Sequence, residues 1–148
     1  MISRETQRHL FNIPKVELHC HLELAYRLNT MKSWAIEDGD LPKGCSDDEF
    51  KAKYMVLSPM NDLPTVLQKF LVTRDRIKSL ERIERLVFEA CEDMYLISNV
   101  RLLELRYAPS FILDKYPELG ADRMHMAIMN GCSKAESKYP IAVGLICL

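Results

Sequence analysis

The sequence predicts an α/β fold in which helices cover a parallel β-sheet. Short apolar runs alternate with long helical patterns in the order strand, helices, strand, helix, strand. This alternation is typical of βαβ units, which place consecutive strands parallel in one sheet. The last strand is almost entirely apolar, as expected when both of its faces are covered. No repeat or Gly/Ser linker divides the chain, so residues 1–148 are predicted to form a single domain.

The first predicted strand runs from Val16 to Leu22 and is bounded upstream by Pro14. Polar and apolar residues alternate along it, and side chains two apart in a strand point to the same face. The polar set expected on one face is Glu17, His19, His21 and Glu23. The apolar set expected to pack on the other face is Val16, Leu18, Cys20 and Leu22. On this face Cys20 is predicted to be a buried structural residue and not a ligand.

A helical region follows, and capping patterns mark where its helices begin. Ser46-Asp47-Asp48-Glu49 is a capping box that opens a short helix. Asp62 is predicted to cap a helix that begins with Leu63-Pro64, because proline is tolerated in the first turn. Ser79 is predicted to cap the longest helix, which runs to about Ser98 and has one apolar stripe. The interleaved acidic residues predict a solvated helical face for Arg74, Arg76, Arg82 and Arg85.

The second predicted strand is Val100–Tyr107, rich in branched and aromatic residues. Asp122 is predicted to cap a further helix, whose apolar face carries Met124, Ile128, Cys132 and Ala135. The third strand spans Ile141 to Leu148. No helix follows this strand to cover its apolar side chains. The polypeptide is therefore expected to continue past Leu148.

Composition excludes several classes of function. Twenty basic residues against twenty-one acidic ones give a net charge of −1, which argues against a nucleic-acid partner or a membrane-surface partner. No apolar signal core or membrane-length run is present. The five cysteines are scattered and form no Cys-x-x-Cys pair, so a disulfide framework is not expected. These features predict a cytosolic (cytoplasmic) protein.

The imidazoles of His19 and His21 form the strongest candidate site. From positions i and i+2 of a strand both rings can reach one ion, and imidazole nitrogens bind zinc at about 2.0–2.1 Å. For an isolated His-x-His, the competing interpretation is a polar face turned to solvent. However, a parallel sheet seldom has a wet face, and Glu104 and Arg106 repeat the polar pattern on the second strand. This favours a polar barrel interior, with Glu17 and Arg106 as a candidate ion pair.

Three segments, in order and at similar spacing, resemble motifs of the adenosine deaminase family. Residues 14–23, PKVELHCHLE, resemble its opening P-K-[VA]-E-L-H-x-H-[LI]-[DE]-G. Leu63-Pro64 through Gln68-Lys69-Phe70-Leu71 resembles the helical segment that covers the family's substrate pocket. Residues 102–109, LLELRYAP, resemble its second-strand motif E-[VL]-R-Y-[SA]-P. The likeness spans essentially the whole chain.

The resemblance implies a TIM-type (β/α)8 barrel, of which this chain is the N-terminal portion, with zinc at the C-terminal ends of the strands. It makes His19 and His21 the first two zinc ligands and Glu23 the acceptor of a sugar hydroxyl. The residues that it places along a small-molecule purine pocket are Leu63, Val66, Leu67, Phe70 and Phe111. The implied reaction is hydrolytic deamination, in which an activated water attacks C6 of a 6-aminopurine and ammonia leaves.

Two departures bear on substrate and activity. Leu24 replaces the family's glycine, and Glu23 is one methylene longer than aspartate, so strict adenosine specificity is not expected. The family's remaining zinc ligands and its catalytic residues follow the third strand, so this segment carries no catalytic residue and is expected to be inactive alone. The missing C-terminal part of the polypeptide is the expected partner. Two alternatives are a truncated, non-catalytic barrel fragment or interaction module, and another metal-dependent hydrolase of the same superfamily.

Overall fold

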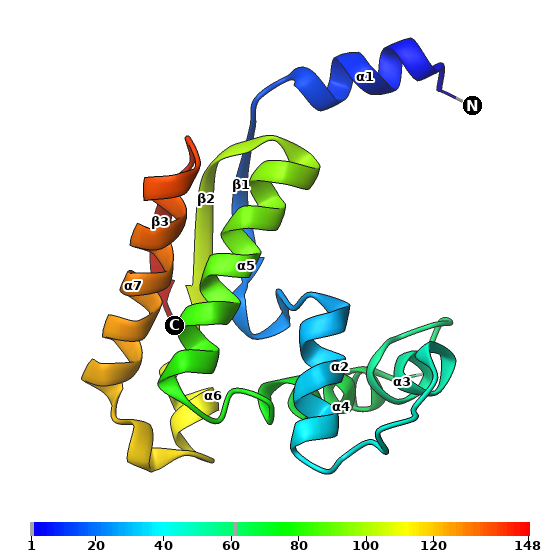
Figure 1. Cartoon of the computed structure of the whole chain (residues 1–148), viewed down its shortest axis with the longest axis vertical. Coiled ribbons are helices and arrows are strands. Elements are labelled where there is room, and N and C mark those ends of the chain that lie inside the picture. The colour runs from blue at the N-terminus through cyan, green and yellow to red at the C-terminus, as the bar shows by residue number, and fades with distance from the viewer. Residues whose placement is uncertain (1, 61) are drawn as a thin grey trace.

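The three strands form one parallel sheet in the order β1-β2-β3, as the sequence predicts. In the computed structural model, which describes residues 2–60 and 62–148, these strands are β1 (Lys15–His21), β2 (Val100–Tyr107) and β3 (Ala142–Cys147). Two long helices, α5 (Leu80–Ser98) and α7 (Ala121–Lys138), run antiparallel to the strands along one face (Figure 1). Each strand–helix–strand passage is thus a βαβ unit.

The other helices lie at the two ends of the sheet. Helix α1 (Arg4–Asn12) precedes β1 and extends beyond the N-terminal ends of the strands (Figure 1). The opposite end carries helices α2 (Leu28–Glu37), α3 (Asp47–Tyr54), α4 (Leu63–Arg74) and α6 (Pro109–Leu113) and the 3-10 turns η1 (Leu22–Leu24) and η2 (Pro117–Leu119). The predicted caps Ser46, Asp62 and Ser79 are confirmed, because each side chain accepts a hydrogen bond from the third residue beyond it. The predicted cap Asp122 is wrong, since α7 begins after Gly120 and Asp122 lies in its first turn.

The main core lies between the sheet and the α5–α7 layer. The predicted stripe of α5 supplies Ile83, Leu86, Val87 and Cys91, and that of α7 supplies Met124, Ile128, Cys132 and Ala135. Alternate residues of β2, including Leu103 and Leu105, complete it with no exposed surface. Gly131 lets the two helices approach closely, because a Cβ there would lie 2.7 Å from both the Glu84 carbonyl oxygen and the Val87 Cβ.

Gly131→Ala is therefore expected to destabilise the protein, despite the helix propensity of alanine. The new methyl group must push α5 away from α7, and overpacking of this kind costs about 1–3 kcal/mol. Urea unfolding followed by circular dichroism measures the loss. Gly144→Ala is the matched control, since its Cβ would meet ordinary contacts of 3.5 Å and beyond. Equal stability of the two variants would show that the helices have room to adjust.

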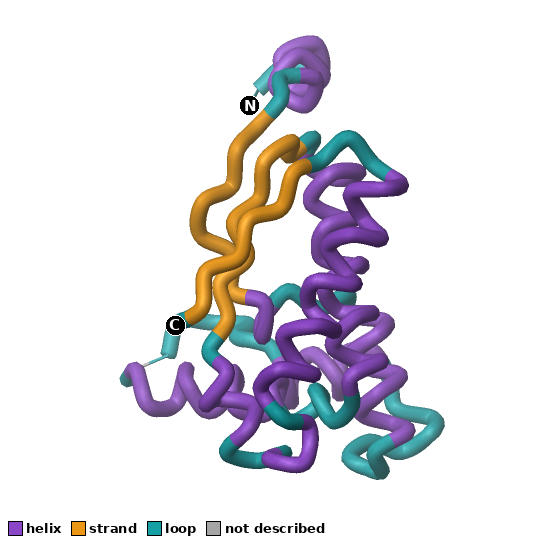
Figure 2. Tube along the Cα trace, turned by 90° about the vertical axis from the view of Figure 1, so that its left-hand side faces the viewer, coloured by secondary structure: helices purple, strands orange, loops and turns teal. Residues whose placement is uncertain are grey.

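The second face of the sheet is bare. Every strand runs with one face against α5 and α7, and no helix of residues 2–60 and 62–148 covers the opposite face (Figure 2). On that face Leu102 is 40% exposed, and Ala142 and Gly144 beside it on β3 are exposed as well. The expectation that β3 is covered on both faces is therefore wrong for this chain. In a closed barrel the same face would point into the interior.

The pairing of β1 with β2 is irregular at two places, and the sequence pattern does not reveal them. Between Lys15 and Val16 the extra residue lies on β2, and between Glu17 and Cys20 it lies on β1. Glu17 pairs with Leu103 and Cys20 pairs with Leu105, so a step of three residues in β1 matches a step of two in β2. Because a bulge adds one residue, the alternation of faces changes phase between these two points. Both β2 partners are completely buried, which places Glu17 and Cys20 on the helix-covered face.

The phase change corrects part of the predicted two-faced strand. Glu17 lies on the face opposite to His21, which pairs with Arg106 on the bare face. Val16 and Leu18, which were expected in the core, are 60% and 55% exposed. Only at the end of the strand do the faces agree with the predicted alternation, with Cys20 towards the helices and His21 on the bare face.

Helices α2 and α3 enclose a second, smaller core of their own. Its buried members are Met31, Ala35, Leu41, Cys45, Phe50 and Tyr54. Ion pairs connect this part to α5 and to the loop before it. Arg27, at the start of α2, contacts Glu92 and Asp93 of α5 at 2.5 and 2.6 Å. These ion pairs add to an apolar contact, because Trp34 of α2 is buried in the main core.

Arginines on α5 and in the loop before it form several of these ion pairs. The prediction that they lie on a solvated helical face is wrong for two of them. Arg76 is 5% exposed and contacts both Asp38, at 2.7 Å, and Asp40. Arg82 contacts Asp38 at 3.0 Å, and its guanidinium lies 5.0 Å from the ring centre of Trp34. The cause is tertiary, because the end of α2 folds against the start of α5.

Among the described residues, no helix combines the length and the apolar character that crossing a membrane requires.

Candidate metal and substrate site

The two histidines converge at the C-terminal end of β1. Nε2 of His19 lies 3.2 Å from Nε2 of His21, and the ring centres are 5.1 Å apart. Two nitrogens that bind one zinc ion at about 2.0–2.1 Å with a tetrahedral angle are about 3.3 Å apart. The pair therefore fits two ligand positions of one zinc ion.

The rest of a zinc coordination sphere is not found in residues 2–60 and 62–148, where no group of three or more His, Cys, Asp or Glu side chains is placed to hold a metal ion. Tetrahedral zinc requires four ligands, of which a catalytic site leaves one position open. His19 and His21 are therefore an incomplete site on their own.

Glu17 and Arg106 do not pair, so the candidate ion pair is wrong. The Glu17 carboxylate accepts a hydrogen bond from the backbone N–H of His19 at 2.9 Å, within the bulge. Arg106 lies on the bare face, and its buried Nε has no hydrogen-bond partner within the described part of the chain. The bulge explains the difference, because it turns Glu17 to the opposite face of the sheet.

Glu23 follows β1 within η1 and lies at the meeting point of three segments. It is 7% exposed, and its Oε1 accepts a hydrogen bond from the Ala108 N–H, directly after β2, at 2.8 Å. Its backbone carbonyl accepts a hydrogen bond from Thr73 Oγ1, near the end of α4, at 3.4 Å. The acidic residue is thus brought to the C-terminal ends of the strands, on the same end of the sheet as the histidines.

The predicted pocket residues lie on α4 and α6, at this same end. On α4, Leu63 and Leu67 are 66% and 44% exposed, whereas Val66 and Phe70 are half-buried. Phe111 of α6 is 41% exposed, with the Arg74 guanidinium 5.3 Å from its ring centre. The structure therefore brings α4, α6 and Glu23 together, and leaves the apolar side chains largely open.

Two residues that hold this arrangement have no signal in the sequence. Tyr26 donates its hydroxyl to the Thr73 carbonyl at 3.0 Å, and the Thr73 hydroxyl reaches Glu23. These contacts join α4 to the segment after β1. They span 47 and 50 residues of sequence, beyond the reach of any local pattern.

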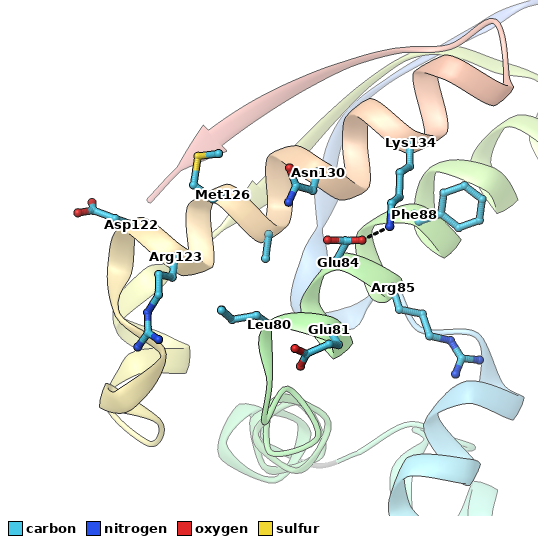
Figure 3. A pocket seen from close by; sticks show the side chains of 11 residues that line it. Leu80, Glu81, Glu84, Arg85, Phe88, Asp122, Arg123, Met126, Asn130 and Lys134 are labelled. Carbon is cyan, nitrogen blue, oxygen red and sulfur yellow. Dashed lines mark hydrogen bonds and ion pairs between the residues drawn. The ribbon is translucent and has the colours of Figure 1, made fainter.

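A separate groove of about 610 Å³ lies between α5 and α7, on the helix layer. Charged residues from both helices line it, and the ion pair of Lys134 with Glu84 crosses it (Figure 3). Because it is lined by the helices and not by the strand ends, it is not part of the histidine site. Its lining includes Leu80, Phe88, Arg123, Met126 and Asn130.

Comparison with known families decides where this chain belongs. The family model described as adenosine deaminase matches residues 14–148, from the start of β1 to the end of β3. The chain belongs to the adenosine deaminase family. Helix α1 precedes the matched region.

Relatives within the adenosine deaminase family cover almost all of this chain. Adenosine deaminase of Clostridium perfringens is 31% identical over 137 residues, which are 93% of this chain and 40% of the relative. Adenosine deaminase of Clostridium botulinum is 29% identical over 134 residues, or 90% of this chain and 40% of the relative. The chain thus spans about 40% of the length of these family members.

Solved structures with the same fold are also covered by this chain over about 40% of their length. A zinc-bound amidohydrolase from Burkholderia ambifaria superposes with a TM-score of 0.82 at 25% identity, covering 99% of this chain and 38% of that one. Adenine deaminase of Arthrobacter aurescens shares the fold, with a TM-score of 0.74, 18% identity, and coverage of 90% and 39%. These relatives are TIM-barrel enzymes, so the three strands here correspond to the first part of such a barrel. The fold predicted from the motifs is confirmed.

Proposed function

We propose that this chain provides the first half of the active site of a zinc-dependent hydrolase that removes the 6-amino group of a purine nucleoside or base. The observation that carries the proposal is the convergence of His19 and His21 at the C-terminal end of β1, with a nitrogen–nitrogen distance of 3.2 Å. In TIM barrels the chemistry lies at this end of the strands. The complete activity belongs to a protein in which further strands close the barrel.

The proposal assigns a role to each of the site residues. His19 and His21 hold the metal, and the chemistry that zinc supplies in such a site is the activation of water as a nucleophile at neutral pH. Glu23 accepts a hydroxyl group of the substrate. The apolar residues of α4 and Phe111 of α6 hold the purine and exclude water from it.

The substrate proposed is a small purine, and relatives define the panel to test. One relative is named adenine deaminase, and Arabidopsis ADAL, at 25% identity and a TM-score of 0.70, was solved with GMP. Leu24 in place of glycine and the longer Glu23 alter the site beside the histidines. We therefore include base, nucleoside and nucleotide substrates, and place their turnover in purine metabolism in the cytosol.

The test uses a polypeptide that continues past Leu148 through the remaining strands. The measurement is release of ammonia from adenosine and adenine and of methylamine from N6-methyl-AMP, together with metal analysis. Release of the amine from one of these substrates by a protein with bound zinc is the expected result. A folded protein that binds zinc but leaves all three unchanged would instead indicate another hydrolase of the superfamily. A natural stop codon after Leu148 would favour a non-catalytic module.

A further inference from the structure

Glu23 connects two segments that are far apart in sequence. Its Oε1 accepts the Ala108 N–H at 2.8 Å, a contact between residues 85 apart. Ala108 is the first residue after β2 and the N-cap position of α6. The Phe111 N–H in turn donates to the Ala108 carbonyl at 3.0 Å. One carboxylate oxygen of Glu23 is therefore linked, through Ala108, to the helix that carries Phe111.

The main chain of Glu23 connects to a third segment. The Thr73 hydroxyl donates its shorter hydrogen bond, 2.6 Å, to the Phe70 carbonyl and lies 3.4 Å from the Glu23 carbonyl oxygen. The neighbouring Arg74 lies over the Phe111 ring, so the end of α4 adjoins both Glu23 and Phe111. The direct connection from Glu23 to the helix that carries Phe111 is the one through Ala108.

The length of the Glu23 side chain matters for this contact. Aspartate, which the family's motif also allows, is one methylene shorter, and its carboxylate would stop more than about 1 Å short of the Ala108 N–H, beyond hydrogen-bonding distance. Within residues 2–60 and 62–148, Glu23 takes part in no ion pair and its Oε2 makes no hydrogen bond. The two oxygens of one carboxylate are therefore available for different tasks.

We propose that Glu23 is a positioning residue, whose Oε1 holds the segment after β2 against the segment after β1 and so sets the place of Phe111 relative to His19 and His21. Oε2, which makes no hydrogen bond within the described residues, is then free for a substrate hydroxyl. The inference rests on the proposed function for the role of Phe111. The contact itself is a property of the folded chain and can be measured without turnover or metal.

The experiment compares Glu23→Gln, Glu23→Asp and Glu23→Ala in the 148-residue chain by NMR amide hydrogen exchange. Loss of the hydrogen bond is expected to speed exchange of the Ala108 N–H about 10-fold in the Asp and Ala variants. Glutamine keeps the acceptor oxygen at the same reach, so Glu23→Gln should restore slow exchange and the parental Phe111 ring resonances.

Glu17→Ala is the matched control, because the Glu17 carboxylate bonds only to the nearby His19 N–H. It should leave Ala108 exchange unchanged. Unchanged Ala108 exchange in Glu23→Ala would overturn the proposal, as would a Glu23→Gln variant that exchanges as fast as Glu23→Ala. Neither outcome bears on zinc binding by the histidines, so failure of this inference and failure of the proposed function remain distinguishable.

Discussion

His19→Ala is expected to abolish both zinc binding and deamination in a polypeptide that completes the barrel. In the proposed site His19 and His21 supply two of the nitrogens that tetrahedral zinc needs, and their Nε2 atoms lie 3.2 Å apart. Removing one imidazole leaves a sphere that cannot hold the ion in the open geometry of a catalytic site. Because the metal activates the attacking water, the rate should fall by about three orders of magnitude or more. Metal analysis of the purified variant and initial rates of ammonia release measure the two effects.

His9→Ala is the matched control for this experiment. His9 is exposed on α1, beyond the opposite end of the sheet. Its substitution therefore removes an imidazole without altering the site. It should keep the zinc content and rate of the parent. A His19→Ala variant that still binds one equivalent of zinc and deaminates its substrate would refute the metal assignment.

Asp38→Ala is expected to lower the free energy of unfolding by about 3 kcal/mol. The Asp38 side chain is 7% exposed and contacts Arg76, Lys78 and Arg82 at 2.7, 3.1 and 3.0 Å. Removing it takes one carboxylate partner from the buried Arg76 and from the largely buried Arg82, which is the costly way to break a buried ion pair. Arg76 keeps its contact with Asp40, so the expected loss lies at the lower end of the usual range.

Urea unfolding of the 148-residue chain measures this change. Asp47→Ala is the matched control, because Asp47 pairs with Lys32 at 2.6 Å but its side chain is 75% exposed. Exposed pairs contribute little, so its unfolding midpoint should match that of the parent. Equal effects of the two substitutions would show that burial of the arginine cluster does not matter for stability.

The lowered pKa values of two ion-paired carboxyl groups, Asp38 and Glu92, predict how stability depends on pH. Burial alone would raise the pKa of Asp38, but hydrogen bonds from Arg82 and Lys78 outweigh it and hold the pKa below its usual value. The Tyr139 hydroxyl, together with Arg27 and Lys138, lowers the pKa of Glu92 to about 2. A carboxyl group with a lowered pKa stabilises the fold above its unfolded pKa and loses that contribution as pH falls through its folded pKa. Stability should therefore fall from about pH 4.5 towards pH 2, and less steeply in Asp38→Ala.

Local patterns predict most of the secondary structure of this chain. Ser46, Asp62 and Ser79 cap helices as expected, because a capping side chain bonds to a backbone N–H only three residues away. The second strand has the predicted bounds, Val100–Tyr107. The prediction fails at Asp122, where Gly120, with a positive φ of 70°, begins the helix instead.

The candidate site also has features that the sequence predicts and features that it cannot predict. The sequence predicts that His19 and His21 can reach one ion, since both lie at the end of one strand, and motif likeness predicts the family. The sequence cannot show that Glu17 lies on the other face, because bulges depend on how β1 pairs with β2, a partner about 85 residues further on. Nor can it show that Glu23 bonds to Ala108.

The sequence by itself determined the order of the strands and helices, the apolar stripes of α5 and α7, and the histidine pair, all of which depend on residues within a few positions of each other. Only the tertiary structure decided the face of Glu17, the burial of Arg76 and the contact of Glu23. Each of these depends on a partner from a distant segment; Arg76 and Asp38 are 38 residues apart, and Glu23 and Ala108 are 85 apart. Whether a polar side chain is solvated or paired depends on which segment folds against it, and periodicity carries no information about that segment.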